Sequence, residues 1–180
     1  MTRRTRLACY VVAAAMSVGA AQPTPPAERF ARVAFLLGTW EGTADGQSGT
    51  GTSRRTYART LDGQFVRVNN RTTYPPQMKN PKGEVHEDEG FLSYDRGRKA
   101  LVLRQFHVEG FVNQYVEVPG TADAPIVFET EAIENIPAGW RARETWTRTG
   151  PDQFEELFEL AEPGKPFELY SRTRFTRGTP

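Results

Sequence analysis

The stretch Phe35-Leu36-Leu37-Gly38-Thr39-Trp40-Glu41-Gly42 decides how the rest of the chain is interpreted. A short apolar segment ends at Gly38, and an extended run starts at Thr39, where Gly42 and Gly46 allow the backbone to bend sharply. After this stretch the sequence consists of short segments separated by turn residues. The stretch therefore predicts the first strand of a small β-barrel.

The residues before this stretch have the pattern of a secretory signal peptide. Met1–Arg6 is basic, Leu7–Val18 is apolar and rich in alanine, and Gly19–Ala21 is a run of small residues. The apolar run is short and alanine-rich, and no later segment is apolar for long enough to cross a bilayer. We therefore predict a signal peptide over residues 1–21, no membrane insertion of the mature chain, and export to the periplasm or the medium. The pair Arg3-Arg4 leaves the twin-arginine route open beside the Sec route.

Composition limits the partners of the exported chain. Removal of Arg3, Arg4 and Arg6 would leave 20 of the 23 basic residues against 22 acidic ones, and the basic residues are not clustered. Binding to nucleic acid would need such a cluster, so none is expected. The only cysteine, Cys9, lies in the predicted signal peptide, which leaves the core to stabilise the fold without a disulfide.

Residues 22–29 are rich in proline and are predicted to be a linker, and residues 30–180 are predicted to form one domain. Apolar residues spaced as on a helix favour one short helix over 28–37, with Phe30, Val33, Ala34 and Leu37 on its apolar side. Ten strands are then expected, at 39–45, 50–60, 63–74, 85–95, 99–107, 110–118, 125–133, 139–148, 152–161 and 166–177.

Alternation of side chains along the expected strands indicates an antiparallel sheet. Trp140, Ala142 and Trp146 alternate with polar residues, and turn residues recur about every dozen positions. The fold class predicted is all-β, a single antiparallel ten-stranded barrel with a short N-terminal helix. A closed sheet of this size has room for a small molecule, although the pattern leaves open which face lines the interior.

Few residues suit catalysis. The mature chain has no cysteine, no Gly-x-Ser-x-Gly motif and two histidines, His86 and His107, so no catalytic residue is assigned and a binding protein is favoured over an enzyme. For a metal, the run His86-Glu87-Asp88-Glu89 and the pair His107 and Glu109 offer imidazole and carboxylate close together. His86 and Asp88 share one face of a strand, and a metal site there would also need His107. The alternative is that these residues form a polar strand end.

Three segments resemble the nitrobindin-like haem-binding β-barrels: Leu36–Gly42, the run His86-Glu87-Asp88-Glu89-Gly90-Phe91, and Pro166–Arg177. They occur in the same order and at similar spacing over most of residues 30–180. The resemblance implies a ten-stranded calycin-like or lipocalin-like barrel. It also implies, in many members, a haem whose iron is held by a histidine on the last strand and which reacts with nitric oxide or isomerises peroxynitrite.

This chain departs from that pattern at the axial position. The family's histidine stands four residues after the proline, and here that position is Tyr170; no histidine follows His107. If haem is bound, the resemblance makes Tyr170 the metal ligand, since tyrosinate can hold haem iron. It would need a cation such as Arg172 to ionise at neutral pH. Alternation places Tyr170 opposite Phe175, so if the apolar face points inward, Tyr170 lies outside the barrel unless a bulge reverses it.

Tyr170 and Arg172 also resemble, in reversed order, the Arg-x-Tyr clamp with which fatty-acid-binding barrels hold a carboxylate. The function predicted is therefore an exported barrel that binds a small apolar or acid-headed molecule, with haem as a possible cofactor. The alternative is a haem-dependent peroxynitrite isomerase or nitric-oxide-reactive protein, and a third is a barrel filled by its own side chains. The ligand-binding residues expected are Trp40, Thr39, Tyr170, Arg172, His86 and Phe91.

Overall fold

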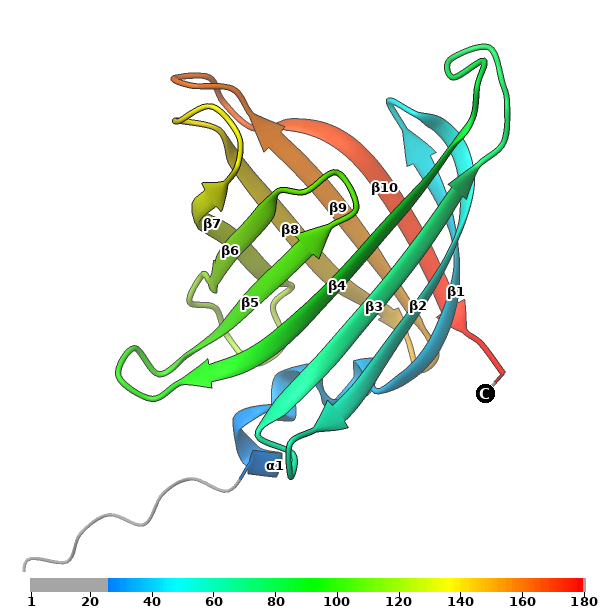
Figure 1. The fold of residues 1–180 in the computed structure, drawn as a ribbon. Helices are drawn as coiled ribbons and strands as arrows, with labels where there is room; N and C mark the ends of the chain where they lie inside the picture. The colour runs from blue at the N-terminus through cyan, green and yellow to red at the C-terminus, as the bar shows by residue number, and fades with distance from the viewer. Residues whose placement is uncertain (1–25, 180) are drawn as a thin grey trace, which may run out of the picture.

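The computed structural model describes residues 26–179 and confirms a closed, ten-stranded, antiparallel barrel (Figure 1). Every strand pairs with its neighbour in the chain, and β1 pairs with β10 to close the sheet. The strands are β1 (Gly38–Gly46), β2 (Gly49–Thr60), β3 (Phe65–Tyr74), β4 (Glu84–Asp95), β5 (Ala100–His107), β6 (Val112–Glu117), β7 (Ile126–Glu134), β8 (Arg141–Gly150), β9 (Gln153–Ala161) and β10 (Glu168–Arg177).

The predicted signal peptide, residues 1–21, and the first part of the predicted linker lie outside the described residues, so both stay predictions. Within residues 26–179, no helix is long and apolar enough to cross a membrane.

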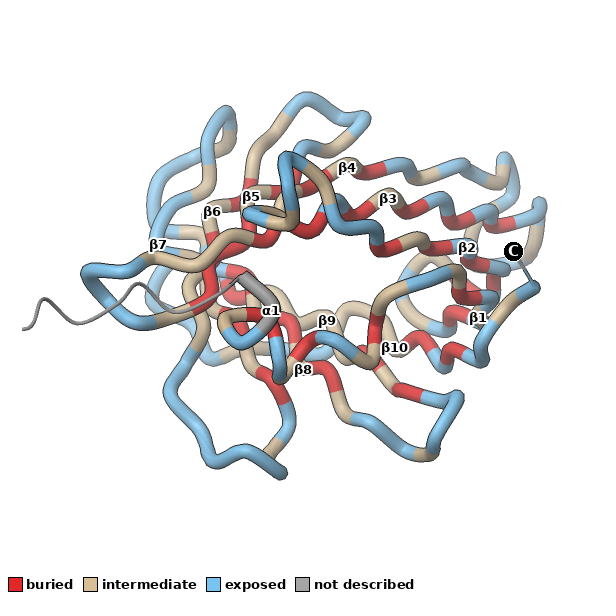
Figure 2. Tube along the Cα trace, turned by 90° about the horizontal axis from the view of Figure 1, so that it is seen from below, coloured by how far each residue is buried: buried red, intermediate tan, exposed pale blue. Residues whose placement is uncertain are grey.

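The N-terminal helical segment lies across one end of the barrel, here called the lower end (Figures 1 and 2). It consists of α1 (Pro26–Arg29) and the 3₁₀ helix η1 (Ala31–Leu36). Phe30, Val33 and Leu36 are buried, while Ala34 is exposed. The predicted helix is thus present, but its buried side repeats every three residues rather than every three to four, as a 3₁₀ helix requires.

Apolar residues fill the lower half of the barrel. Trp40 is fully buried, packs edge-on against Phe154 with ring centroids 4.8 Å apart, and donates its Nε1–H to the carbonyl oxygen of Leu36. Phe154 in turn stacks on Phe175. The stretch from Phe35 to Gly42 therefore closes the lower end and places the first strand against the last.

Polar residues occupy the inward face higher up the same strands. On β2 the buried positions alternate regularly and read Ser53, Arg55 and Tyr57 from top to bottom. The inward face therefore changes from apolar to polar halfway up the barrel. This change leaves room for a site at the upper end, which is formed by the loops that follow β1, β3, β5, β7 and β9.

A β-bulge interrupts β10 next to the upper end. The pairing of β10 with β9 shifts between Leu169 and Ser171, and the carbonyl oxygen of Tyr170 accepts a hydrogen bond from the backbone N–H of Gln47. Gly46 lies directly against this bulge, where a Cβ atom would come within 2.8 Å of the Cα atom of Ser171. The absence of a side chain at Gly46 therefore lets β1 and the bulge approach each other.

We expect Gly46→Ala to lower the free energy of unfolding by about 1–3 kcal/mol, because the added methyl group must displace the backbone of β10. Urea denaturation followed by circular dichroism measures this change. Gly120→Ala is the matched control, since a Cβ at Gly120 meets its nearest atom at an ordinary 3.6 Å. Equal stability of the two variants would show that the bulge tolerates a side chain from β1.

Candidate functional site

A cavity of about 530 Å³ occupies the upper half of the barrel. One wall is polar and comes from β2 to β6: Arg55, Asn70, Thr72, His86, Asp88, Gln105, His107 and Asn113. The opposite wall is largely apolar and comes from β7 to β10 and the β7–β8 loop: Ile133, Ile136, Pro137, Trp140, Phe158, Leu160 and Tyr170. The volume lies in the range of small-molecule sites.

A buried ion pair forms the floor of the cavity. Both terminal guanidinium nitrogens of Arg55 on β2 contact the carboxylate of Glu156 on β9, with Nη2 and Oε1 3.0 Å apart. The two side chains are only 6% and 8% exposed. Arg55 also donates through Nε to Asn70 and through Nη1 to the hydroxyl of Tyr57. The charge of Arg55 is therefore compensated inside the protein and is not free for a ligand.

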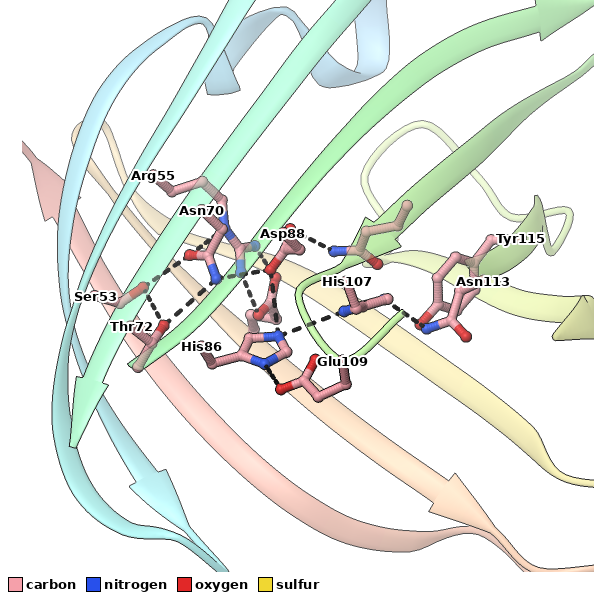
Figure 3. Close-up of polar contacts among 12 residues, drawn as sticks. Ser53, Arg55, Asn70, Thr72, His86, Asp88, His107, Glu109, Asn113 and Tyr115 are labelled. Carbon is pink, nitrogen blue, oxygen red and sulfur yellow. Dashed lines mark hydrogen bonds and ion pairs between the residues drawn. The ribbon is translucent and has the colours of Figure 1, made fainter. Parts of the chain in front are cut away.

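A chain of hydrogen bonds crosses the polar wall from β2 to β5 (Figure 3). Ser53 donates to Oδ1 of Asn70, Nδ2 of Asn70 donates to Asp88, and Gln105 donates to the other oxygen of Asp88, at 2.9, 2.9 and 3.0 Å. Burial alone would raise the pKa of Asp88, but the hydrogen bond with His86 and the charge of Arg55 hold it below its usual value. Asp88 is therefore an anion in the wall.

Glu144 on β8 is a second acid facing the interior. It is buried, and its Oε2 accepts a hydrogen bond from Nε1 of Trp146 at 3.0 Å. Burial and the negative charge of Glu156 raise the pKa of Glu144 to about 8. This carboxyl group therefore carries its proton at neutral pH and can donate a hydrogen bond into the cavity.

Two histidines meet at the rim of the polar wall (Figure 3). Nδ1 of His107 lies 3.4 Å from Nε2 of His86, and Nδ1 of His86 lies 2.8 Å from Oε1 of Glu109. Burial alone would lower the pKa of His86, but hydrogen bonds with Asp88 and Glu109 raise it to about 9. Burial lowers the pKa of His107 to about 4. His86 and His107, which the sequence analysis considered together for a metal, thus lie next to each other, and the carboxylate that joins them in a cluster is that of Glu109.

Of the six expected ligand-binding residues, His86 and Tyr170 line the cavity. Trp40 belongs to the core of the lower half, and Thr39 is half-buried beside it at the same end. Phe91 lies between the buried Gly90 and Leu92, so its side chain points to the outer face of β4.

Tyr170 reaches the cavity because of the bulge in β10. Its ring packs edge-on against Phe158, with centroids 5.7 Å apart. Arg172, two residues on, does not follow it inward and lies near Glu155 on the outer face, with Nε and Oε2 3.6 Å apart. Tyr170 and Arg172 therefore form no clamp that faces the cavity.

The sequence reasoning missed several residues of the site, chiefly Arg55, Glu144 and Glu156. The sequence did contain a signal for two of them. Glu144 stands two residues from both Ala142 and Trp146, and Glu156 stands two residues from both Phe154 and Phe158, so each acid shares a strand face with these residues. Acids at positions that share a face with buried aromatic residues indicate a polar interior.

A closed antiparallel barrel with an apolar lower half and a two-walled upper cavity defines a small-ligand-binding barrel. Residues 29–177 match the family model described as the THAP4-like, heme-binding beta-barrel domain, so the chain belongs to that family. A search of curated proteins gives no significant match.

Solved structures agree on the fold. The protein Rv2717c from M. tuberculosis is 16% identical, with 84% of this chain and 98% of that chain covered and a TM-score of 0.63. The S-type phycobiliprotein lyase CPES from Guillardia theta is 13% identical, with 85% and 92% covered and a TM-score of 0.50. At these identities the likeness concerns the fold alone.

The residues of this cavity do not fit the haem that the family description implies. On the last strand the donor facing the cavity is Tyr170, and Arg172, the cation expected to ionise it, lies on the outer face. The propionates of haem would also meet a wall that already holds carboxylates.

Proposed function

We propose that this protein binds a small amphipathic molecule whose polar end is uncharged or cationic. The observation that carries the proposal is the two-walled cavity of about 530 Å³. The wall with Ile133, Trp140 and Phe158 suits an apolar body, and the polar wall suits a short head with several hydrogen-bonding groups. Support also comes from membership of a family described as binding a small cofactor.

The charges of the lining argue against an acidic head group. Arg55 is paired with Glu156, and His86 is hydrogen-bonded to Glu109. The lining contains the further carboxylates Glu84 and Asp88. A carboxylate or phosphate head would therefore find no uncompensated arginine and would be repelled by these acids. This proposal narrows the sequence prediction, which allowed an acid-headed ligand held by Tyr170 and Arg172.

We also propose that binding takes place outside the cytoplasm, in the periplasm or the medium, on the basis of the signal-peptide pattern in residues 1–21.

The binding proposal is tested with a neutral apolar dye, Nile red, and an anionic one, cis-parinaric acid. We expect Nile red fluorescence to rise saturably with the purified protein and cis-parinaric acid to bind more weakly. Phe158→Arg places a cation in the apolar wall and should therefore weaken Nile red binding at least about tenfold. Leu169→Arg, at an exposed position beside the bulge, is the control that should bind normally. Equal dye binding by both variants would overturn the proposed site.

Haem is tested separately, because the alternative function of a haem-dependent peroxynitrite isomerase needs an axial ligand. After addition of haemin we expect no Soret band that depends on Tyr170. Tyr170→Phe and Tyr94→Phe should therefore give the same spectrum, since Tyr94 lies in β4 away from the cavity. A Soret band that is present in Tyr94→Phe and lost in Tyr170→Phe would establish tyrosinate ligation and favour the haem enzyme.

A further inference from the structure

Two imidazoles and a carboxylate converge at the rim of the cavity in a way that the binding of an amphipathic molecule does not explain. The candidate ligand atoms of His86, His107 and Glu109 all lie within 4.8 Å of one another. We propose that these three residues bind a divalent transition-metal ion, with Zn²⁺ as the reference ion. The site goes beyond the proposed ligand binding and does not depend on it.

The spacing of the two imidazoles suits one shared ion. Ring nitrogens held at about 2.0–2.1 Å from a tetrahedral Zn²⁺ are separated by roughly 3.4 Å. Nε2 of His86 and Nδ1 of His107 face each other at 3.4 Å. The register of the sheet produces this meeting, because His107 on β5 pairs with Asp88 on β4, two positions from His86 on the same face.

A carboxylate and an open side complete the set. Glu109 lies two residues after the end of β5 and is half exposed; its Oε1 is 2.8 Å from Nδ1 of His86, the nitrogen that does not face His107, and its carboxylate lies within 4.8 Å of the other candidate ligand atoms. Asp88 lies beside the same ring, with its Oδ2 3.6 Å from Nε2 of His86. His86, His107 and Glu109 stand at the edge of the cavity. A ligand in the cavity could therefore occupy the remaining position on the ion. Two histidines and one carboxylate with an open position are typical of catalytic zinc and non-haem iron sites.

Unpartnered polar atoms next to the histidines give independent support. In the described part of the chain, Oε1 of Gln105 and Oδ1 of Asn113 are buried without a hydrogen-bond partner. These residues are only 4% and 1% exposed, and both line the cavity. Buried polar atoms left unpaired are costly, and in a native protein they point to a bound group or a functional role.

Asn113 is also placed to orient one of the metal ligands. Its Nδ2 lies 3.1 Å from Nε2 of His107. When Nδ1 of His107 holds an ion, its proton lies on Nε2, and rotation of the Asn113 amide would let Oδ1 accept it. Metal-binding histidines commonly donate their second N–H to such an acceptor.

The test uses the full-length protein without a histidine tag, since His86 and His107 are its only histidines. Titration with ZnCl₂ in a calorimeter, without any dye or organic ligand, should show one saturable site. Co²⁺ should give visible absorption bands of a four- or five-coordinate ion. We expect His107→Gln to weaken Zn²⁺ binding at least 100-fold, and Glu109→Gln to weaken it roughly 10- to 100-fold.

Glu87→Gln is the matched control, because Glu87 is as exposed as Glu109 but pairs with Arg71 on the outer face. It should bind Zn²⁺ like the parent protein. Glu109 lies in an exposed loop, so its variant keeps the test valid if His107→Gln fails to fold. Absence of a saturable site in the parent protein, or equal Zn²⁺ binding by Glu109→Gln and Glu87→Gln, would overturn the metal site. The dye-binding experiment would still decide separately whether the cavity binds a small molecule.

Discussion

Replacing Glu156 with leucine is expected to lower the free energy of unfolding by about 3–5 kcal/mol, because it leaves a charged arginine buried and unpaired. Arg55 contacts Glu156 through both terminal nitrogens, and the two side chains are less than a tenth exposed. Urea denaturation at neutral pH measures the loss.

The double variant Arg55→Met/Glu156→Leu should recover most of that loss, since two apolar side chains need no charge partner. The exposed pair of Arg54 on β2 and Glu41 on β1 provides the comparison on the outer face of the barrel. Glu41→Gln should cost no more than about 1 kcal/mol. If Glu156→Leu lowers the free energy of unfolding as little as Glu41→Gln does, the buried ion pair does not stabilise the barrel.

Replacing Glu144 with glutamine is expected to stabilise the protein in mildly alkaline solution and to have little effect near pH 5. The folded protein raises the pKa of Glu144 to about 8 through burial and the charge of Glu156, with Arg55 acting in the opposite direction. A carboxyl group with a raised pKa in the folded state favours folding below its unfolded pKa, and this advantage is lost as the pH rises through about 8.

The parent protein should therefore lose stability on the order of 3 kcal/mol from this one group between pH 5 and pH 8.5. Glutamine cannot ionise, and its amide oxygen can still accept the hydrogen bond from Trp146. Denaturation curves at pH 5, 7 and 8.5 should show the two proteins diverging as the pH rises. Glu162→Gln, in the exposed turn after β9, should follow the parent protein throughout. Parallel profiles for Glu144→Gln and the parent protein would mean that Glu144 is already ionised in the fold.

The two buried acids and Arg55 together account for the selectivity that we propose for the cavity. Glu144 in its neutral form can donate a hydrogen bond, whereas Glu156 is occupied by Arg55. An arginine held in this way stabilises the floor and offers no free charge to a ligand. The proposed preference for an uncharged or cationic head follows from this arrangement.

The fold was predictable because its determinants are local. Alternation along each segment specifies a strand, and turn residues specify where it ends. The ten expected strands correspond to the ten observed ones, and the helical segment before Gly38 is present. The departure in that segment, a 3₁₀ helix in which Val33 and Leu36 are buried and Ala34 is exposed, arises from packing into the lower end of the barrel.

The site was less predictable because it depends on contacts between strands. The resemblance implied an axial position for Tyr170, an expectation that stays untested, and only the bulge in β10 turns Tyr170 toward the cavity and leaves Arg172 outside. A bulge changes the face of every residue beyond it, and its position depends on the neighbouring strand, here on the close approach of Gly46.

By itself, the amino-acid sequence determined the ten-stranded antiparallel barrel, the helical segment before Gly38, and the presence of two histidines near acids, whereas Trp40, expected to bind ligand, was placed in the core of the lower end only by the tertiary structure. Only the tertiary structure decided that Arg55 pairs with Glu156, that Glu144 faces the interior, and that His86, His107 and Glu109 meet. The physical reason is that strand formation depends on neighbours in the chain, whereas burial, charge pairing and pKa depend on the register between strands distant in sequence.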